Sequence, residues 1–309
     1  MLRFAERTGL TSKAPSKRYL WTDAFAVCNF LALDRYDLAA KLVDRVHAEL
    51  GVARGIRIGK PLRERGADEP YDPDLEWERD GQYFHYLTKW MHALHQIGDD
   101  SRARRLMNDA HEGFTYGPPG RRRMFWKMSI DLRRPLVTSM GQHDPLDGYV
   151  TCEELGDLAH ARDDFAEMLS HERLTTTDPL GLGGLLFDAA RLRQIGGHDD
   201  LARTLVAAAR EGLRRWVAGP DLDAPAEHRL AFRELGLAIG LAAVPNLADD
   251  VRDAIEAFWL RPESRRASTW TEHRDIDEVM LATTLLPDGF VVLAPVTHGA
   301  GSSMAQASV

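Results

Sequence analysis

Apolar residues recur along most of the chain at intervals of three and four positions, which is the spacing of one face of an α-helix. Gly and Pro residues end several of these periodic segments, as they do at helix termini. The pattern predicts about eleven helices, at residues 21–33, 35–50, 81–97, 99–114, 149–155, 157–171, 181–194, 199–216, 227–241, 247–259 and 272–286. The apolar run at 290–296 predicts a short strand or an extended closing segment. The sequence therefore predicts an all-α fold.

The predicted helices alternate between more apolar and more amphipathic members. Four amphipathic helices, which begin near residues 36, 99, 157 and 199, each follow a turn with Asp or Gly and are rich in Ala. Stacked helical hairpins require such alternation. TPR repeats would recur about every 34 residues, whereas the spacing here is uneven and long insertions follow only the first two hairpins. This favours a closed toroid of six hairpins over an open TPR-like superhelix.

The predicted helix at 81–97 has two contrasting faces. One face is apolar and carries Tyr83, Leu87, Trp90, Leu94 and Ile97. The almost opposite face is polar and carries Gln82, His85, Lys89, His92 and Gln96. An imidazole and amine stripe of this kind is consistent with a helix facing an internal cavity, and equally with a solvated helix face.

Composition narrows the class of protein. The chain has 309 residues and a net charge of −8, which argues against nucleic acid as a partner. Two cysteines, Cys28 and Cys152, lie in apolar helical pattern and fit buried thiols of a reduced protein. The N-terminus lacks the apolar core of a signal peptide, and no run approaches about 18 apolar residues. We therefore expect a cytoplasmic protein with no membrane partner; the oligomeric state cannot be predicted.

The chain divides into three predicted parts. Residues 1–20 are mostly polar and are expected to form an N-terminal arm. Residues 21–296 would form one helical domain, and residues 297–309, which are small and polar, a disordered tail.

The irregular stretch at 121–148 has the highest density of reactive groups. It is rich in Pro, Gly and strand-forming residues, and is far longer than the usual connection of about 4–6 residues. Loops held on a rigid scaffold are common places for functional groups. The alternative is a polar connection that caps its neighbours. The stretch contains Trp126, Lys127, Asp131, Arg134, Ser139, Gln142, His143, Asp144 and Asp147.

Basic residues gather in the two long irregular stretches, 52–79 and 121–148. They are Arg57, Lys60, Arg63, Arg65, Arg121, Arg122, Arg123, Lys127, Arg133 and Arg134. These cations could bind a carboxylate or phosphate of a substrate. They could equally pair with the acidic run in the first stretch, which is Asp68, Glu69, Asp72, Asp74, Glu76 and Glu78.

The hairpin number, the aromatic starts of the inner helices (Trp21, Tyr83, Phe84) and the Asp and His residues beside them give the chain a family resemblance. Over residues 21–286 it resembles the six-hairpin glycosidase-like superfamily. The resemblance implies an (α/α)6 toroid built from helical hairpins, with the two long irregular loops at the pocket mouth. Members include glycoside hydrolases, unsaturated glucuronyl hydrolases and sugar 2-epimerases. It therefore implies a carbohydrate-active enzyme that acts on a small sugar, neutral or anionic, with no metal or other cofactor.

Candidate catalytic residues follow from this chemistry. Glycoside hydrolysis needs one carboxyl that donates a proton and a second that activates water or attacks the sugar. Asp144 and Asp147 are the strongest local pair, and Asp80 or Asp275 could supply a partner from another hairpin. Each of these carboxylates could instead be an ordinary helix cap.

The remaining candidates are histidines and groups that would hold the substrate. An epimerase would use histidines as acid and base near neutral pH, and the candidates are His85, His143 and His273. Sugar rings would stack on Trp126 and Tyr83, with Trp21, Trp77 and Trp270 as further aromatic candidates. The residues expected to bind polar or anionic groups of the substrate are Lys89, Lys127, Arg134 and Gln142.

Other functional classes remain open. A non-catalytic helical-repeat scaffold would bind a peptide or a partner protein. A terpene-cyclase-like or metal-dependent enzyme is suggested by DDFAE at 163–167, DIDE at 275–278 and the pair His143–Asp144. DDFAE lacks a second metal motif and is interpreted as a charged surface, and DIDE departs from the cyclase acid motif at its last position. HExxH, P-loop and GxSxG motifs are absent.

Overall fold

The computed structural model describes residues 1–66, 68–170 and 173–294. Helices dominate these residues, so the all-α prediction is confirmed. The helices are α1 (Leu2–Arg7), α2 (Leu20–Ala32), α3 (Tyr36–Leu50), α4 (Pro73–Glu78), α5 (Phe84–Gln96), α6 (Asp100–Phe114), α7 (Asp144–Leu155), α8 (Ala159–Leu169), α9 (Pro179–Ile195), α10 (Asp199–Val217), α11 (Ala231–Ala243), α12 (Asp249–Leu260), α13 (Ser268–Glu272), α14 (Arg274–Leu285) and α15 (Asp288–Val291). The strands are β1 (Gln82–Tyr83), β2 (Thr115–Tyr116), β3 (Arg123–Met124), β4 (Lys127–Met128) and β5 (Pro135–Val137).

Each of the eleven predicted helices is present, with shifts at the ends. α7 begins five residues earlier than predicted, at Asp144, with Pro145 in its first turn, where the missing N–H of proline costs nothing. α5 begins later than predicted because Gln82 and Tyr83 pair with β4. The extended segment predicted at 290–296 is wrong at its start, since residues 288–291 form α15. Residues 295–296 and the predicted tail at 297–309 lie outside the described residues.

The N-terminal segment is more ordered than the sequence suggests. Residues 2–7 form α1, and Phe4 and Leu10 are buried against the helical core. Arg7 forms ion pairs with Asp275 and Glu278 on α14. These apolar and ionic contacts dock the segment on the domain.

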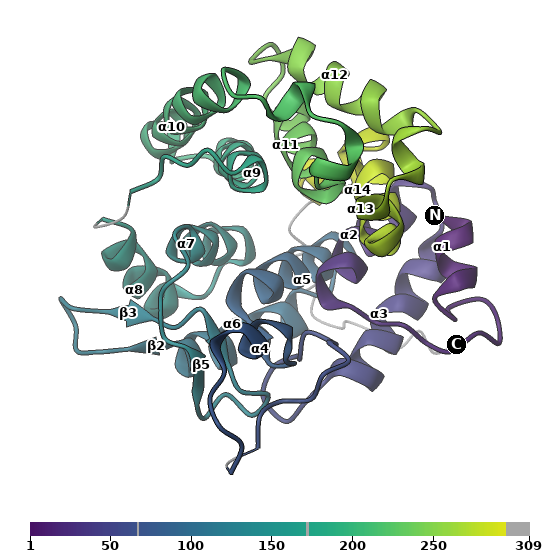
Figure 1. The fold of residues 1–309 in the computed structure, drawn as a ribbon. Coiled ribbons are helices and arrows are strands. Elements are labelled where there is room, and N and C mark those ends of the chain that lie inside the picture. Colours follow the sequence, from purple (N-terminus) through teal and green to yellow (C-terminus); the bar gives the residue numbers. More distant parts are fainter. Residues whose placement is uncertain (67, 171–172, 295–309) are drawn as a thin grey trace, which may run out of the picture.

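Within the described residues, six helices contact one another in a closed cycle. α2 contacts α5, α5 contacts α7, α7 contacts α9, α9 contacts α11, α11 contacts α14, and α14 returns to α2. Figure 1 shows these helices around the middle of the molecule. The next helix along the chain packs on each of the first five, so that α3, α6, α8, α10 and α12 complete five hairpins.

The closest contact in this cycle is between α9 and α11, and it depends on glycine. A Cβ atom on Gly183 would lie 2.1 Å from the backbone oxygen of Gly236, and one on Gly240 would lie 2.4 Å from the oxygen of Gly183. Any side chain at these positions would push the two helices apart.

This packing gives a stability prediction. Gly183→Ala should lower the free energy of unfolding by about 1–3 kcal/mol, because the methyl group has no space. Gly184→Ala is the matched control: nothing lies within 4 Å of its Cβ position, so it should keep or raise stability by up to about 1 kcal/mol, as alanine favours helix. Denaturant titration of both variants measures the difference. Equal stabilities would contradict the packing argument.

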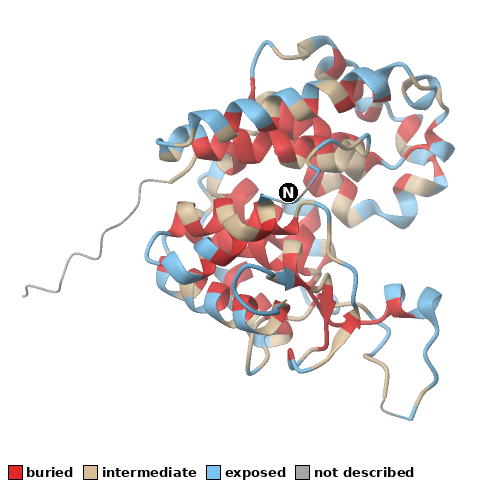
Figure 2. Cartoon of the chain, turned by 90° about the vertical axis from the view of Figure 1, so that its left-hand side faces the viewer, coloured by how far each residue is buried: buried red, intermediate tan, exposed pale blue. Residues whose placement is uncertain are grey.

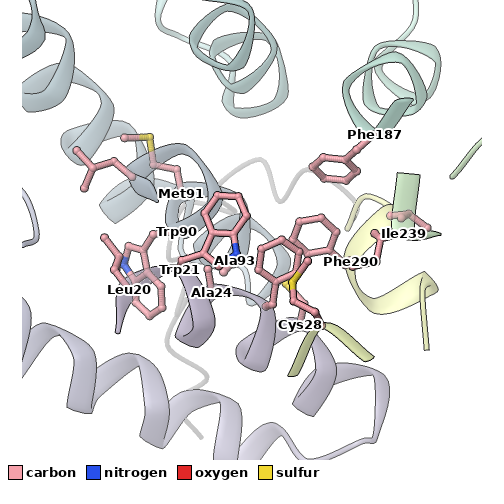
Figure 3. Close-up of a cluster of buried hydrophobic side chains, with 14 of the residues drawn as sticks. Leu20, Trp21, Ala24, Cys28, Trp90, Met91, Ala93, Phe187, Ile239 and Phe290 are labelled. Carbon is pink, nitrogen blue, oxygen red and sulfur yellow. The ribbon is translucent and has the colours of Figure 1, made fainter. Parts of the chain in front are cut away.

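The middle of the cycle is filled mainly by apolar side chains. Figure 2 shows buried residues along the inner helices and exposed ones on the outer helices and loops. Phe290 of α15 stacks on Phe25 and Phe187, with ring centres 4.2 and 4.5 Å apart. Figure 3 shows Phe187 and Phe290 beside Trp21, Ile239 and Cys28. α15 therefore closes one end of the central space.

The irregular stretch at 121–148 and the segment directly before α5 meet in a small sheet. β1, β4 and β5 form three antiparallel strands, and β2 pairs with β3 in a separate hairpin. This sheet ties the start of α5 to the stretch that precedes α7. Among the described helices, none is long and apolar enough to cross a membrane. Cys28 and Cys152 are free and buried, as predicted.

Candidate functional site

Four of the predicted site residues meet between α5 and α7, and together they are called the acid cluster: Asp144, Asp147, His85 and Lys89. Asp144 is the first residue of α7, and Asp147 lies one turn further along. Lys89 Nζ donates a hydrogen bond of 2.7 Å to Asp147 Oδ1, and His85 Nδ1 lies 3.6 Å from Asp144 Oδ1. Asp144 stands at a helix start, where a carboxylate often serves as a cap. Its side chain instead lies beside His85 of the neighbouring helix α5.

The two carboxyls of the acid cluster have opposite proton affinities. Burial raises the pKa of Asp144 well above its ordinary value, and the nearby charge of Asp147 raises it further. Burial alone would also raise the pKa of Asp147, but the Lys89 ammonium beside it holds the pKa below its ordinary value. The two carboxyls therefore differ in proton affinity, since Asp144 holds its proton more tightly than Asp147 does. This division is the general arrangement for acid–base chemistry with two acidic residues.

Two buried polar atoms at this position lack partners. Asp144 Oδ2 and Trp21 Nε1 are buried without a hydrogen-bond partner among the described residues. The Trp21 and His85 rings lie edge to face, 6.0 Å apart, which places the indole beside the cluster. Buried polar atoms are usually satisfied by protein, water or ligand.

Aromatic rings cover the acid cluster on one side. Tyr83 stacks on His85 with ring centres 5.4 Å apart, and Trp126 lies 5.5 Å from Tyr83. The indole N–H of Trp126 donates to His85 Nδ1 at 3.3 Å, which fixes the neutral tautomer with its proton on Nε2. Burial also lowers the pKa of His85 to about 4. Trp77, which is exposed, packs edge-on against Trp126. This aromatic wall consists of Trp77, Tyr83 and Trp126.

A cavity of about 30 Å³ lies at the centre of the helix cycle beside Lys89. Its other lining residues are apolar or glycine and include Trp21, Phe25, Phe187, Gly184 and Met280. This volume has room for about two water molecules. A sugar ring is therefore too large for this cavity.

The polar face of α5 continues inward as a buried charge network that sequence reasoning did not identify as a unit. Arg191 of α9 donates to Glu154 Oε2 at 2.7 Å and to Asp188 Oδ1 at 3.0 Å. Glu154 Oε1 contacts His92 Nδ1 at 2.7 Å, and His92 Nε2 contacts the Phe290 carbonyl at 2.8 Å. Lys89 and His92 are thus buried, so the explanation of this helix face as solvated is wrong for both residues.

The sequence signal for this network was available. Asp188 and Arg191 are charged residues three positions apart inside an otherwise apolar helix, LLFDAARL. Charges are rarely buried unless they are paired. Burial raises the pKa of Asp188 to about 7.

Asp80 and Lys127, two predicted site residues, use their polar atoms to fix backbone. Asp80 accepts from the guanidinium of Arg57 and from the backbone N–H groups of Gly59, Lys60 and Gly81, and so holds a loop. Lys127 Nζ donates to the carbonyls of Glu76 and Arg79, although burial lowers its pKa to about 8. Both therefore support the wall that carries Tyr83.

Gln142 and His143 precede Asp144 and also bind backbone. Gln142 donates to the carbonyls of Arg173 and Thr175 at 2.8 and 3.0 Å, and His143 Nε2 contacts the Leu174 carbonyl at 2.9 Å. They attach the start of α7 to the segment before α9. Both residues directly precede Asp144 in the chain, and the contacts of their side chains are those of positioning groups.

Four other predicted residues lie apart from the acid cluster in their contacts. Asp275 pairs with Arg7 at 2.7 Å. His273 is exposed at the start of α14, where its Nδ1 contacts the Thr269 carbonyl at 3.0 Å. Arg134 pairs with Glu64 at 2.6 Å. Trp270, a candidate stacking surface, is buried against Trp259 in the core.

The basic residues of the irregular stretches are largely engaged within the chain. Arg63 pairs with Glu69, Arg65 with Glu76 and Lys60 with Glu78. The predicted pairing with the acidic run accounts for these three cations. Four others pair with carboxylates outside that run: Arg57 with Asp80, Arg122 with Asp164, Arg133 with Asp131 and Arg134 with Glu64. The site thus offers less positive charge to an anionic substrate than the sequence suggested.

The two acidic motifs differ from their sequence interpretation. Asp163 of DDFAE is exposed as expected, but the solvated-surface interpretation is wrong for Asp164, which is buried beside His111. In DIDE, both oxygens of Asp277 are buried without a partner among the described residues, and burial raises its pKa to about 8. Side chains placed to share a metal ion are His111, His160 and Asp164, on α6 and α8 rather than in the acid cluster.

Comparisons with known proteins do not extend this description. The chain matched no protein-family model, no curated protein and no solved structure.

Proposed function

We propose that the chain is a carbohydrate-active enzyme of the six-hairpin glycosidase-like type, with its helix cycle forming an (α/α)6 toroid. The reaction proposed is hydrolysis of a glycosidic bond at the acid cluster. The observation that carries the proposal is a pair of buried carboxyls whose pKa values are shifted in opposite directions, that of Asp144 upward by burial and that of Asp147 downward by Lys89, 2.7 Å away. The closed contacts of α2, α5, α7, α9, α11 and α14, with five hairpin partners outside, support the architecture.

Each carboxyl has a role in this proposal. Asp144 would donate its proton to the oxygen of the departing sugar as the glycosidic bond breaks. Asp147 would either accept a proton from the attacking water or attack the sugar carbon itself, and Lys89 would keep it ionised until then. Asp144 Oδ2, which is buried without a hydrogen-bond partner among the described residues, would make the transfer.

The aromatic wall supports a sugar as the substrate class. Apolar faces of sugar rings pack on aromatic side chains, and Trp77 and Trp126 retain solvent access next to the acid cluster. A neutral sugar fits the site better than an anionic one, because Lys127 and Arg134 are engaged with backbone and with Glu64. His85 is a poor proton carrier near neutral pH with a pKa of about 4, which favours hydrolysis over histidine-based epimerisation.

A ligand screen tests the substrate class. Thermal unfolding of the full chain should shift upward with at least one neutral mono- or oligosaccharide, because a ligand that binds only the folded state stabilises it. Uronic acids and sugar phosphates form the anionic arm of the screen, and are expected to give smaller shifts. Trp126→Ala should remove the shift because the stacking surface is lost, whereas Tyr36→Ala, an exposed aromatic on α3, should keep it.

The screen can also reject the proposal. If no sugar shifts the unfolding temperature, or if Trp126→Ala responds as the wild type does, the acid cluster is not a sugar site of this kind.

A further inference from the structure

A second group of functional side chains lies between the outer helices α6 and α8. His111 comes from α6, and His160 and Asp164 come from α8, where a spacing of four residues places them on one helix face. One ligand atom from each residue lies within 4.8 Å of the other two. The group is independent of the acid cluster and of the function proposed for it.

The three side chains differ in exposure in a way that suits a metal ion. His111 and Asp164 are buried and fixed, with His111 Nε2 and Asp164 Oδ2 2.9 Å apart. His160 is exposed, and its ring lies edge to face with that of His111, 5.2 Å between centres. Two fixed ligands and one at the surface leave an open side toward solvent for entry of an ion and for a water ligand.

We propose that His111, His160 and Asp164 bind a divalent transition-metal ion of the zinc class. Two imidazoles and one carboxylate are the donors that Zn²⁺ takes, and three protein ligands plus one water complete a tetrahedral shell. The harder ions Mg²⁺ and Ca²⁺ prefer all-oxygen sites and should bind poorly. The metal would replace the hydrogen bond that now joins His111 to Asp164.

Arg122 is the competitor for this site. Its Nε lies 3.2 Å from Asp164 Oδ2 but is not hydrogen bonded to it, since this Nε is a buried atom without a hydrogen-bond partner among the described residues. The backbone N–H of Arg122 is held separately by Glu167 at 2.7 Å, so its loop stays attached without the side-chain contact. An incoming cation would take the carboxylate from Arg122. Removing the guanidinium should therefore tighten metal binding.

A bound ion would also join two outer helices. α6 packs chiefly on α5, and α8 chiefly on α7. A metal held by both would cross-link the second hairpin to the third, and would stabilise the folded state by mass action.

The experiment is a calorimetric titration of the untagged, metal-stripped full chain with Zn²⁺. Binding of one ion per chain is expected, accompanied by a rise in unfolding temperature. Co²⁺ should give the visible absorption of a four-coordinate N/O site, which identifies the shell directly. His160→Ala should weaken binding by at least about tenfold, since even outer-shell partners are worth 10–100-fold. Its exposure makes this variant safe for folding.

Matched controls separate a site from general histidine binding. His228→Ala removes another exposed histidine and should leave the affinity unchanged. Arg122→Gln should increase the affinity for Zn²⁺. Such an increase is not expected if the histidines have a purely structural role. The proposal is overturned if the wild type shows no saturable Zn²⁺ binding, or if His160→Ala binds as tightly as His228→Ala does.

Discussion

Asp144→Asn should lower the turnover of a glycoside substrate by about 10²- to 10⁴-fold, which is the usual contribution of one general acid. The amide is close in size to a protonated carboxyl but cannot give up a proton to the leaving oxygen. Burial raises the pKa of Asp144 and so favours its uncharged form, and Asn at this position is uncharged as well. The unfolding temperature should therefore stay near that of the wild type.

Asp147→Asn should lower turnover to a similar extent for a different reason. It removes the carboxylate that activates water or attacks the sugar, and it leaves the buried Lys89 ammonium without its partner. Loss of one member of a buried ion pair costs about 3–5 kcal/mol, so this variant should also be less stable. The contrast between the two variants separates chemistry from folding.

The pH profile of the wild type follows from the same two groups. The pKa of Asp147 lies below its ordinary value, so activity should persist in mildly acidic solution and fall only as Asp147 becomes protonated. The pKa of Asp144 lies well above its ordinary value, so activity should fall on the alkaline side as Asp144 loses its proton. The kcat/KM profile should thus be bell-shaped. Asp144→Asn should abolish the alkaline limb in any residual activity.

An exposed aspartate provides the control for these measurements. Asp163→Asn on α8 should leave turnover and the pH profile unchanged. If Asp144→Asn turned over substrate as fast as the wild type, Asp144 would not be the general acid. If Asp147→Asn were also fully active, the assignment of the acid cluster as the active site would be refuted.

Much of the fold followed from the sequence because helical periodicity is a local signal. The helix at 21–33 is found as α2, and that at 99–114 as α6, within one residue at each end. α1 and α15 were missed because each is shorter than two turns and gains its stability from packing, Phe4 and Phe290 being buried. Short helices carry too little pattern to be recognised without their tertiary contacts.

The site was only partly predictable, because spacing along one helix does not identify neighbours from another. Asp144 and Asp147 were predicted from their own spacing, and Lys89 from the polar face of α5. Their meeting depends on α5 packing against α7, which the sequence does not encode locally. Asp80 looked equivalent to Asp144, since both are aspartates just before or at a helix start. In the structure Asp80 is held by Arg57 and by three backbone N–H groups, so that it fixes a loop, whereas Asp144 lies in the acid cluster. Only the folded loop brings these partners to Asp80.

Arg191→Met should lower the stability of the helix cycle substantially. Arg191 is fully buried and binds Glu154, Asp188 and the Thr151 hydroxyl. Met fills much of the same space but leaves the Glu154 carboxylate without its guanidinium partner. Removing one member of such a buried network costs about 3–5 kcal/mol. Denaturant titration should show the lower free energy of unfolding.

Two further variants test whether the loss comes from the unpaired charge. Arg193→Met lies on the same helix but is exposed, so it should change stability by less than about 0.5 kcal/mol. Arg191→Met combined with Glu154→Gln removes the stranded charge and should recover part of the lost stability, a non-additive result expected only for residues in contact. If Arg191→Met were as stable as Arg193→Met, the network would not stabilise the α7–α9 contact. If instead the double variant lost as much free energy of unfolding as Arg191→Met and Glu154→Gln lose together, the packing of the arginine side chain would matter more than its charge.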